Sequence, residues 1–147
     1  MVFRCVVVAT DGSRTAEVAV QHGIALARGS AAHLHLVNAR RSGGGLMATT
    51  HETAAFVGTC LAEEADAQGK LGATLERRAA ELRAEGIEVA VHCRVGDPAE
   101  VIVRLAEEVG ADLVVVGNRG MQRRMLGSVP NSVSHRAPCS VLIVRTT

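Results

Sequence analysis

The sequence predicts an α/β fold: a Rossmann-like, open, mostly parallel five-stranded sheet with helices on both faces and strand order 3-2-1-4-5. Short apolar runs alternate with segments of helical spacing along the chain. The runs are nearly continuous, which is typical of strands covered on both faces. Successive strand–helix units connect right-handedly into a parallel sheet. At 147 residues we expect a single domain over residues 1–147.

The first part of the chain is expected to supply two strands, a helix and a loop. A strand is predicted over 3–9, followed by turn residues that end in Ser13, a suitable N-cap for a helix to about residue 28. The second strand is predicted over 33–39. Residues 40–59 show little periodicity and contain three successive glycines, so we expect a flexible loop there, of a length that is usually functional or disordered.

The rest of the chain repeats the strand–helix alternation. Asp97 can cap a helix that has Pro98 at its first position, and Glu100 can complete a capping box. The elements expected from here on are a helix over 61–83, a strand over 87–94, the helix from Pro98 to Gly110, a strand over 113–116, a short helix over 130–136 and a last strand over 139–145.

Composition and charge exclude several classes of function. Sixteen basic and fifteen acidic side chains leave a net charge of +1, which gives no electrostatic reason to bind nucleic acid or an anionic membrane. Phe3 and Phe56 are the only aromatic residues, so a base-stacking platform is nearly excluded. No uncharged apolar run approaches the roughly 18 residues that span a bilayer. With no secretory signal at the N-terminus, we expect a cytoplasmic protein.

In open parallel sheets, ligands bind beyond the carboxyl ends of the strands, at the point where strand order reverses. The residues there should follow the first, second and fourth strands. They are Thr10-Asp11-Gly12, Val37 to Arg40 and the segment from Gly117 to Val129. Asp11 has an alternative role as a turn residue that binds its own backbone.

The segment after the fourth strand has the residues of a phosphate cradle. Gly117 and Gly120 can adopt positive φ and let a ligand approach the backbone, so a branched side chain at Gly117 should obstruct that ligand. Gly127 and Ser128 open a helix whose free N–H groups favour an anion. Lys70 is the only lysine and follows no glycine loop, which excludes a Walker A loop. The alternative is a long glycine-containing turn before a capped helix.

Arginines add positive charge near the same edge. Arg40, Arg41, Arg119, Arg123 and Arg124 all follow predicted strands, and guanidinium groups pair well with phosphate oxygens. Of these, Arg119, Arg123 and Arg124 are the candidate phosphate contacts, with a solvated basic loop as the alternative.

Three segments resemble the universal stress protein family: Val6 to Ser13, Asp112 to Gly117, and Gly127-Ser128-Val129, with Pro138 before a final apolar strand. The resemblance extends over essentially the whole chain and is weakest over 40–71. The nucleotide-binding branch carries the pattern G-x2-G-x9-G-[ST]. In this chain only six residues separate Gly120 from Gly127, so the loop is three residues shorter than that pattern.

The resemblance implies an adenine-nucleotide site, with Asp11 against the ribose or adenine and Ala9, Thr10 and Val37 around the base. The residues it places around the ribose and phosphates are Gly117, Asn118, Gly120, Gly127, Ser128 and Val129. ATP is the first ligand it implies, and Mg²⁺ can accompany the nucleotide. A shorter loop reduces the room for a γ-phosphate, which would favour ADP or AMP.

No catalytic residue is predicted, because Asp11 is the only obvious carboxylate at the expected site and phosphoryl transfer needs positioned metal ligands. We therefore expect a nucleotide-binding regulatory protein. The alternatives are a slow ATPase or self-phosphorylating protein with Ser128 or Thr10 as acceptor, a cyclic-AMP binder, and a stress-associated interaction domain that binds no nucleotide.

Two further expectations concern partners and metals. Residues 139–145 are predicted to form an apolar edge strand that can pair with a second copy of the chain, giving a homodimer; the resemblance points the same way. His33 and His35 lie on one face of the second strand, but no carboxylate or cysteine partner is implied, and His92 lies on a different strand. No metal site is predicted.

Overall fold

Five strands form one sheet in the order β3-β2-β1-β4-β5, and every neighbouring pair is parallel, which confirms the predicted fold class. This computed structural model describes residues 2–41, 69–118 and 126–146. The strands are β1 (Cys5–Ala9), β2 (His33–Arg40), β3 (Val89–Val95), β4 (Leu113–Asn118) and β5 (Ser140–Arg145).

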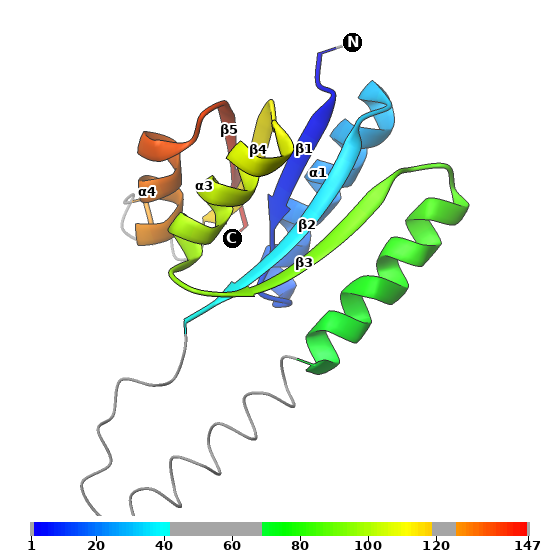
Figure 1. Cartoon of the computed structure of the whole chain (residues 1–147), viewed down its shortest axis with the longest axis horizontal. Coiled ribbons are helices and arrows are strands. Elements are labelled where there is room, and N and C mark those ends of the chain that lie inside the picture. Colours follow the sequence, from blue (N-terminus) through cyan, green and yellow to red (C-terminus); the bar gives the residue numbers. More distant parts are fainter. Residues whose placement is uncertain (1, 42–68, 119–125, 147) are drawn as a thin grey trace, which may run out of the picture.

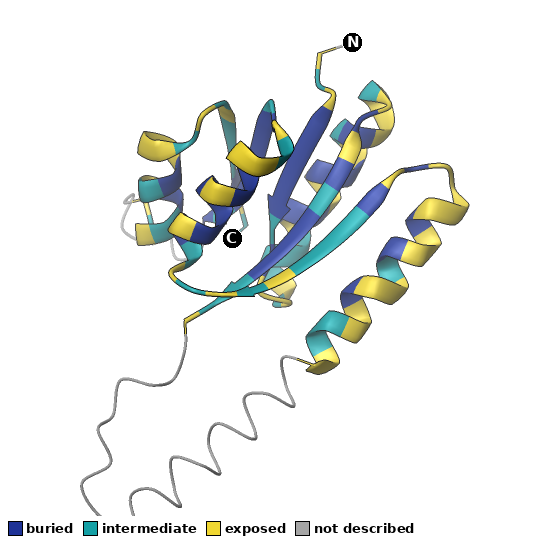
Figure 2. Cartoon of the chain, viewed as in Figure 1, coloured by how far each residue is buried: buried dark blue, intermediate teal, exposed yellow. Residues whose placement is uncertain are grey.

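Helices cover both faces of the sheet (Figure 1). One face carries α1 (Arg14–Ser30) and a helix whose described part covers residues 69–84; the other carries α3 (Pro98–Val109) and α4 (Ser128–Arg136). Each face has its own apolar core. Val6 and Val8 of β1 pack towards α1, whereas Val7 packs towards α3 and α4. The central strands are accordingly the most deeply buried part of the chain (Figure 2).

The helix caps follow the sequence closely. Ser13 Oγ accepts a hydrogen bond of 3.1 Å from the backbone N–H of Ala16, and Asp97 Oδ2 accepts one of 3.2 Å from that of Glu100. The predicted return hydrogen bond of the capping box, from the Asp97 N–H to the Glu100 side chain, is wrong. The Glu100 carboxylate instead accepts from Arg104 at 3.2 Å, one helical turn further on, because a charged partner binds it more strongly than a backbone amide does.

Element boundaries differ from the prediction where pairing between strands decides them. Strand β4 runs two residues further, to Asn118, because Gly117 and Asn118 pair with Val144 and Arg145 of β5. Arg40 pairs with Val95 and belongs to β2 rather than to the predicted loop. Helix α4 begins at Ser128, which confirms that Gly127 and Ser128 open it, and it is two residues longer at its start than the predicted range 130–136. The rest of the predicted loop, 42–59, and residues 61–68 of the predicted helix lie outside the described residues.

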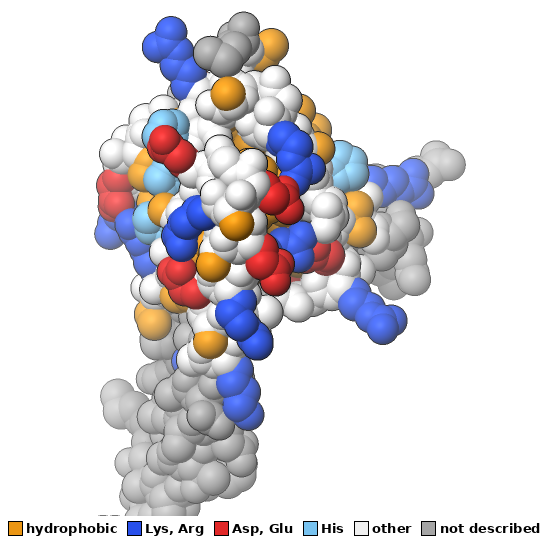
Figure 3. All heavy atoms as spheres, turned by 90° about the vertical axis from the view of Figure 1, so that its right-hand side faces the viewer, with side chains coloured by type: hydrophobic (Ala, Val, Ile, Leu, Met, Phe, Trp, Pro, Cys, Tyr) orange, Lys and Arg blue, Asp and Glu red, His pale blue; other side chains and the backbone are white. Residues whose placement is uncertain are grey.

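Side chains of both signs are interspersed on the face of the molecule shown in Figure 3. Ion pairs link neighbouring elements. Glu17 of α1 pairs with Arg78 of the helix at 69–84 at 2.6 Å, and Arg28 of α1 pairs with Glu85 in the turn after that helix. Within the described ranges, no helix has the length and apolar character needed to cross a membrane.

Two histidines that the sequence left without partners meet across the sheet. His35 of β2 and His92 of β3 bring Nδ1 and Nε2 to 3.0 Å. Their ring centroids are 5.2 Å apart, so the rings meet through these nitrogens, edge to edge. Burial lowers the pKa of both imidazoles, and His92 lowers that of His35 further. The pair is therefore held in the neutral state, in which one ring donates and the other accepts.

This pair predicts a loss of stability towards acid. A histidine with a lowered pKa in the folded state takes up a proton more readily when unfolded, so the free energy of unfolding falls as pH drops below about 6.5. We expect the urea midpoint to fall between pH 7.5 and 5.5. The fall should be clearly smaller in the double variant His35→Gln, His92→Gln. Replacing the exposed His22 in the same way is the control, and an unchanged pH dependence in the double variant would contradict the assignment.

Candidate nucleotide site

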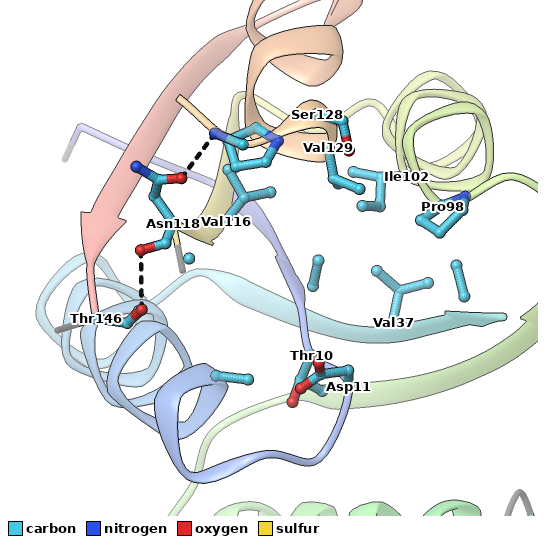
Figure 4. Close-up of a pocket in the computed structure, with 16 residues that line it drawn as sticks. Thr10, Asp11, Val37, Pro98, Ile102, Val116, Asn118, Ser128, Val129 and Thr146 are labelled. Carbon is cyan, nitrogen blue, oxygen red and sulfur yellow. Dashed lines mark hydrogen bonds between the residues drawn. The ribbon is translucent and has the colours of Figure 1, made fainter. Parts of the chain in front are cut away.

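A pocket of about 310 Å³ opens at the carboxyl ends of β1, β2 and β4 (Figure 4). It contains every predicted site residue that the structure describes: Ala9, Thr10, Asp11, Val37, Gly117, Asn118, Gly127, Ser128 and Val129. The remaining predicted residues, Gly120, Arg119, Arg123 and Arg124, lie outside the described residues. Segments more than a hundred positions apart in the chain thus meet around one cavity.

The chain after β1 forms one wall of the pocket. Thr10 is buried, and its N–H donates to the carbonyl of Val37 at 2.9 Å, which ties the end of β1 to β2. Its Oγ1 accepts from the N–H of Gly12 at 3.1 Å, and Gly12 has a φ of 80°. Asp11 Oδ1 accepts from the N–H of Ser13 at 2.9 Å. Asp11 is therefore a turn residue, as in the alternative interpretation, and its side chain also lines the pocket.

The N-terminus of α4 forms the opposite wall. Gly127 occupies the N-cap position and, having no side chain, supplies no cap to the helix. Its own N–H donates to Asn118 Oδ1 at 2.9 Å. Within the described residues, the N–H groups of Ser128 and Val129 have no side-chain cap, and the next residue, Pro130, has no N–H. Two backbone donors at the positive end of a helix thus border the cavity, an arrangement that favours an anion.

Between these walls the lining is mostly apolar, and the sequence prediction missed most of it. Ala39 also lines the pocket and lay within the predicted segment from Val37 to Arg40. The lining residues that the prediction missed are Ala16, Pro98, Ile102, Val116, Pro130 and Thr146. Some of them had a signal in the sequence. Val116 shares a strand face with Asn118, and Pro98 and Ile102 are four positions apart on α3. An apolar wall beside a few polar groups is typical of a small-molecule site.

The positive φ predicted for Gly117 is wrong. Gly117 is not among the glycines with positive φ, because β4 continues through it in the extended conformation. A Cβ at this position would lie 2.9 Å from Thr146 Cγ2 and 3.5 Å from Ala19 Cβ. A branched side chain would therefore press on α1 and the end of the chain, so it would disturb packing and would not cleanly test contact with a ligand.

The charged groups limit what the pocket can do chemically. Asp11 is the one carboxylate among the described lining residues. Arg41 pairs with Asp97 at 3.0 Å and does not line the pocket. In the described part of the chain, no three His, Cys, Asp or Glu side chains are grouped so that they could hold a metal ion. The arrangement provides backbone donors and an apolar wall, which suit binding better than acid–base chemistry.

Known proteins share both the sequence and the fold. Residues 3–145 match the model of the Universal stress protein family. The Mycobacterium tuberculosis universal stress protein Rv1636 is 55% identical over 56 residues, a match that covers 36% of this chain but only 38% of that protein. A universal stress protein solved in complex with cAMP is 32% identical, with each chain fully covered and a TM-score of 0.72. The Archaeoglobus fulgidus universal stress protein solved with dAMP is 28% identical, with 99% of this chain and 100% of that one covered and a TM-score of 0.62. The chain belongs to the universal stress protein family.

Proposed function

We propose that this protein binds an adenine nucleotide in the pocket and acts in the cytoplasm as a regulatory protein whose state depends on nucleotide occupancy. The observation that carries the proposal is the meeting of the uncapped N-terminus of α4 with an apolar wall in one cavity. A phosphate needs the first feature and a base needs the second. The relatives solved with cAMP and dAMP support the same class of ligand.

The lining suggests how the nucleotide lies. The base would pack on the apolar side chains of Val37 and Ile102. The ribose would come near Thr10 and Asp11 at the end of β1. The phosphate would then reach the N–H groups of Ser128 and Val129 and the Ser128 hydroxyl, where the helix dipole stabilises negative charge.

The preferred nucleotide is a separate question. The family resemblance places ATP first, with Mg²⁺ able to accompany it, whereas the two solved relatives hold monophosphates. The loop between Gly120 and Gly127 is three residues shorter than the family pattern, which favours a shorter phosphate tail. The affinities for ATP, ADP, AMP and cyclic AMP therefore have to be compared.

The enzymatic alternative has less support in the geometry. Hydrolysis needs an orienting base and metal ligands, and the one described carboxylate of the pocket, Asp11, already holds the turn to Ser13. A slow ATPase, or transfer to Ser128 or Thr10, would show itself by products that form over hours.

We expect calorimetry with the purified chain to show saturable binding of at least one of these four nucleotides, and the bound nucleotide to stay chemically unchanged over hours. The reason is that the site offers donors and apolar contact but little acid–base machinery. Steady release of ADP from ATP would favour the alternative of a slow ATPase. If no nucleotide gave a heat of binding, the remaining alternative would be an interaction domain that binds no nucleotide.

A negative charge introduced at the start of α4 tests whether the phosphate binds there. Ser128→Asp adds a negative charge that stabilises the helix but repels an anionic ligand. We predict at least tenfold weaker nucleotide binding, about 1.4 kcal/mol, with thermal stability unchanged or raised. Asn131→Asp places the same charge on the same helix, outside the pocket lining, and is the matched control. If both variants lost the same affinity for the nucleotide, the phosphate would not lie at the start of α4.

We also propose that the protein forms a homodimer through residues 139–145. Strand β5 lies at the end of the sheet order, so one edge of its backbone has no strand beside it within the described sheet. Val141, Leu142 and Ile143 are only partly buried. Antiparallel pairing of two β5 strands about a twofold axis would cover both the edge and these side chains.

Sedimentation at micromolar concentration is expected to show a dimer. Val141→Lys places a charge on the proposed interface and should shift the mass towards the monomer. A wild-type protein that stays monomeric at tens of micromolar would contradict the dimer without affecting the nucleotide proposal.

A further inference from the structure

Asn118 is a polar residue at the end of an otherwise apolar strand, and only 1% of it is exposed. Its Oδ1 accepts from the N–H of Gly127 at 2.9 Å, and its backbone carbonyl accepts from Thr146 Oγ1 at 3.0 Å. Its Nδ2 is buried and has no hydrogen-bond partner within the described residues. A buried donor left unpaired is costly, so a residue chosen for packing alone would be apolar, as its strand neighbours Val114 and Val116 are.

These bonds make Asn118 the junction of three elements. The dashed lines in Figure 4 run from Asn118 to the start of α4 on one side and to Thr146, which follows β5, on the other. Gly127 has no side chain with which to cap its own helix. The Asn118 side chain, nine positions earlier in the sequence, holds this N-cap residue by accepting its backbone N–H.

We propose that Asn118 is a positioning residue that gives the site its preference for phosphorylated over unphosphorylated adenosine, an inference that rests on the proposed function. By holding the Gly127 N–H, Asn118 directs the neighbouring N–H groups of Ser128 and Val129 at the place where the phosphate lies. Thr146 supports it by fixing the Asn118 backbone.

The contribution should be confined to one end of the ligand. The walls assigned to the base and the ribose come from β1, β2 and α3, which Asn118 does not hold in place through any of its described side-chain bonds. A misplaced α4 N-terminus therefore weakens contact with the phosphate more than contact with the base and ribose. Backbone donors contribute most to the free energy of binding when they are already fixed in place, because binding then includes no cost of ordering them.

The test compares AMP with adenosine by calorimetry in the full chain. Asn118→Val removes the acceptor for Gly127 and fills the space with a side chain of the kind found at Val116. We expect the wild type to bind AMP more tightly than adenosine. In the variant, the ratio of AMP affinity to adenosine affinity should fall at least tenfold.

A second pair of variants keeps the test valid if Asn118→Val does not fold. Thr146→Val removes the hydroxyl that donates to Asn118 while keeping the shape of the side chain, and Thr146→Ser keeps the hydroxyl. We expect Thr146→Val to lower the ratio of AMP to adenosine affinity about threefold and Thr146→Ser to leave it unchanged.

The outcomes separate this inference from the proposed function. If the wild type binds AMP but the folded Asn118→Val variant keeps the same ratio, the positioning role is wrong and the nucleotide site stands. The role is equally overturned if the wild type binds AMP and adenosine equally well. Should Asn118→Val fail to fold, an unchanged ratio in Thr146→Val overturns it. If the wild type binds no nucleotide at all, the proposed function fails and this inference falls with it.

Discussion

The site depends on a reversal of direction in a parallel sheet. The chain leaves β1 for α1 on one face, whereas it leaves the neighbouring strand β4 for α4 on the other. The two connections therefore diverge, and a crevice opens between them at the carboxyl ends of the strands. This divergence places the two polar walls of the candidate site, since one follows β1 and the other follows β4.

The two walls of the pocket differ in the polar groups that they leave available. The turn after β1 uses its polar atoms internally: Thr10 holds Gly12, and Asp11 holds Ser13. The start of α4 instead leaves backbone donors without a side-chain cap, because its N-cap residue is glycine. The protein thus presents donors to an anion at one end and apolar surface at the other.

The helix caps and the class of fold could be predicted from the sequence because they depend on local chemistry. Ser13 and Asp97 cap helices as their side chains require, and the alternation of apolar and helical segments gives a parallel sheet with helices on both faces. The errors lie where a distant partner decided the outcome. Glu100 bonds Arg104 rather than its own helix start. Gly117 stays extended because β5 pairs with it. His35 and His92 meet only because β2 and β3 are neighbours in the sheet.

The sequence by itself determined the class of fold, the edge of the sheet at which a ligand would lie, and most of the residues found there. Turn, cap and strand preferences act over a few positions, and connection rules convert them into a topology. Only the tertiary structure decided which atoms remain available at that edge. It brought Thr146 to the site from the end of the chain and occupied one side of Asn118 with Gly127. It also turned position 117 towards α1. Such outcomes depend on contacts between segments far apart in the chain, and no local pattern encodes them.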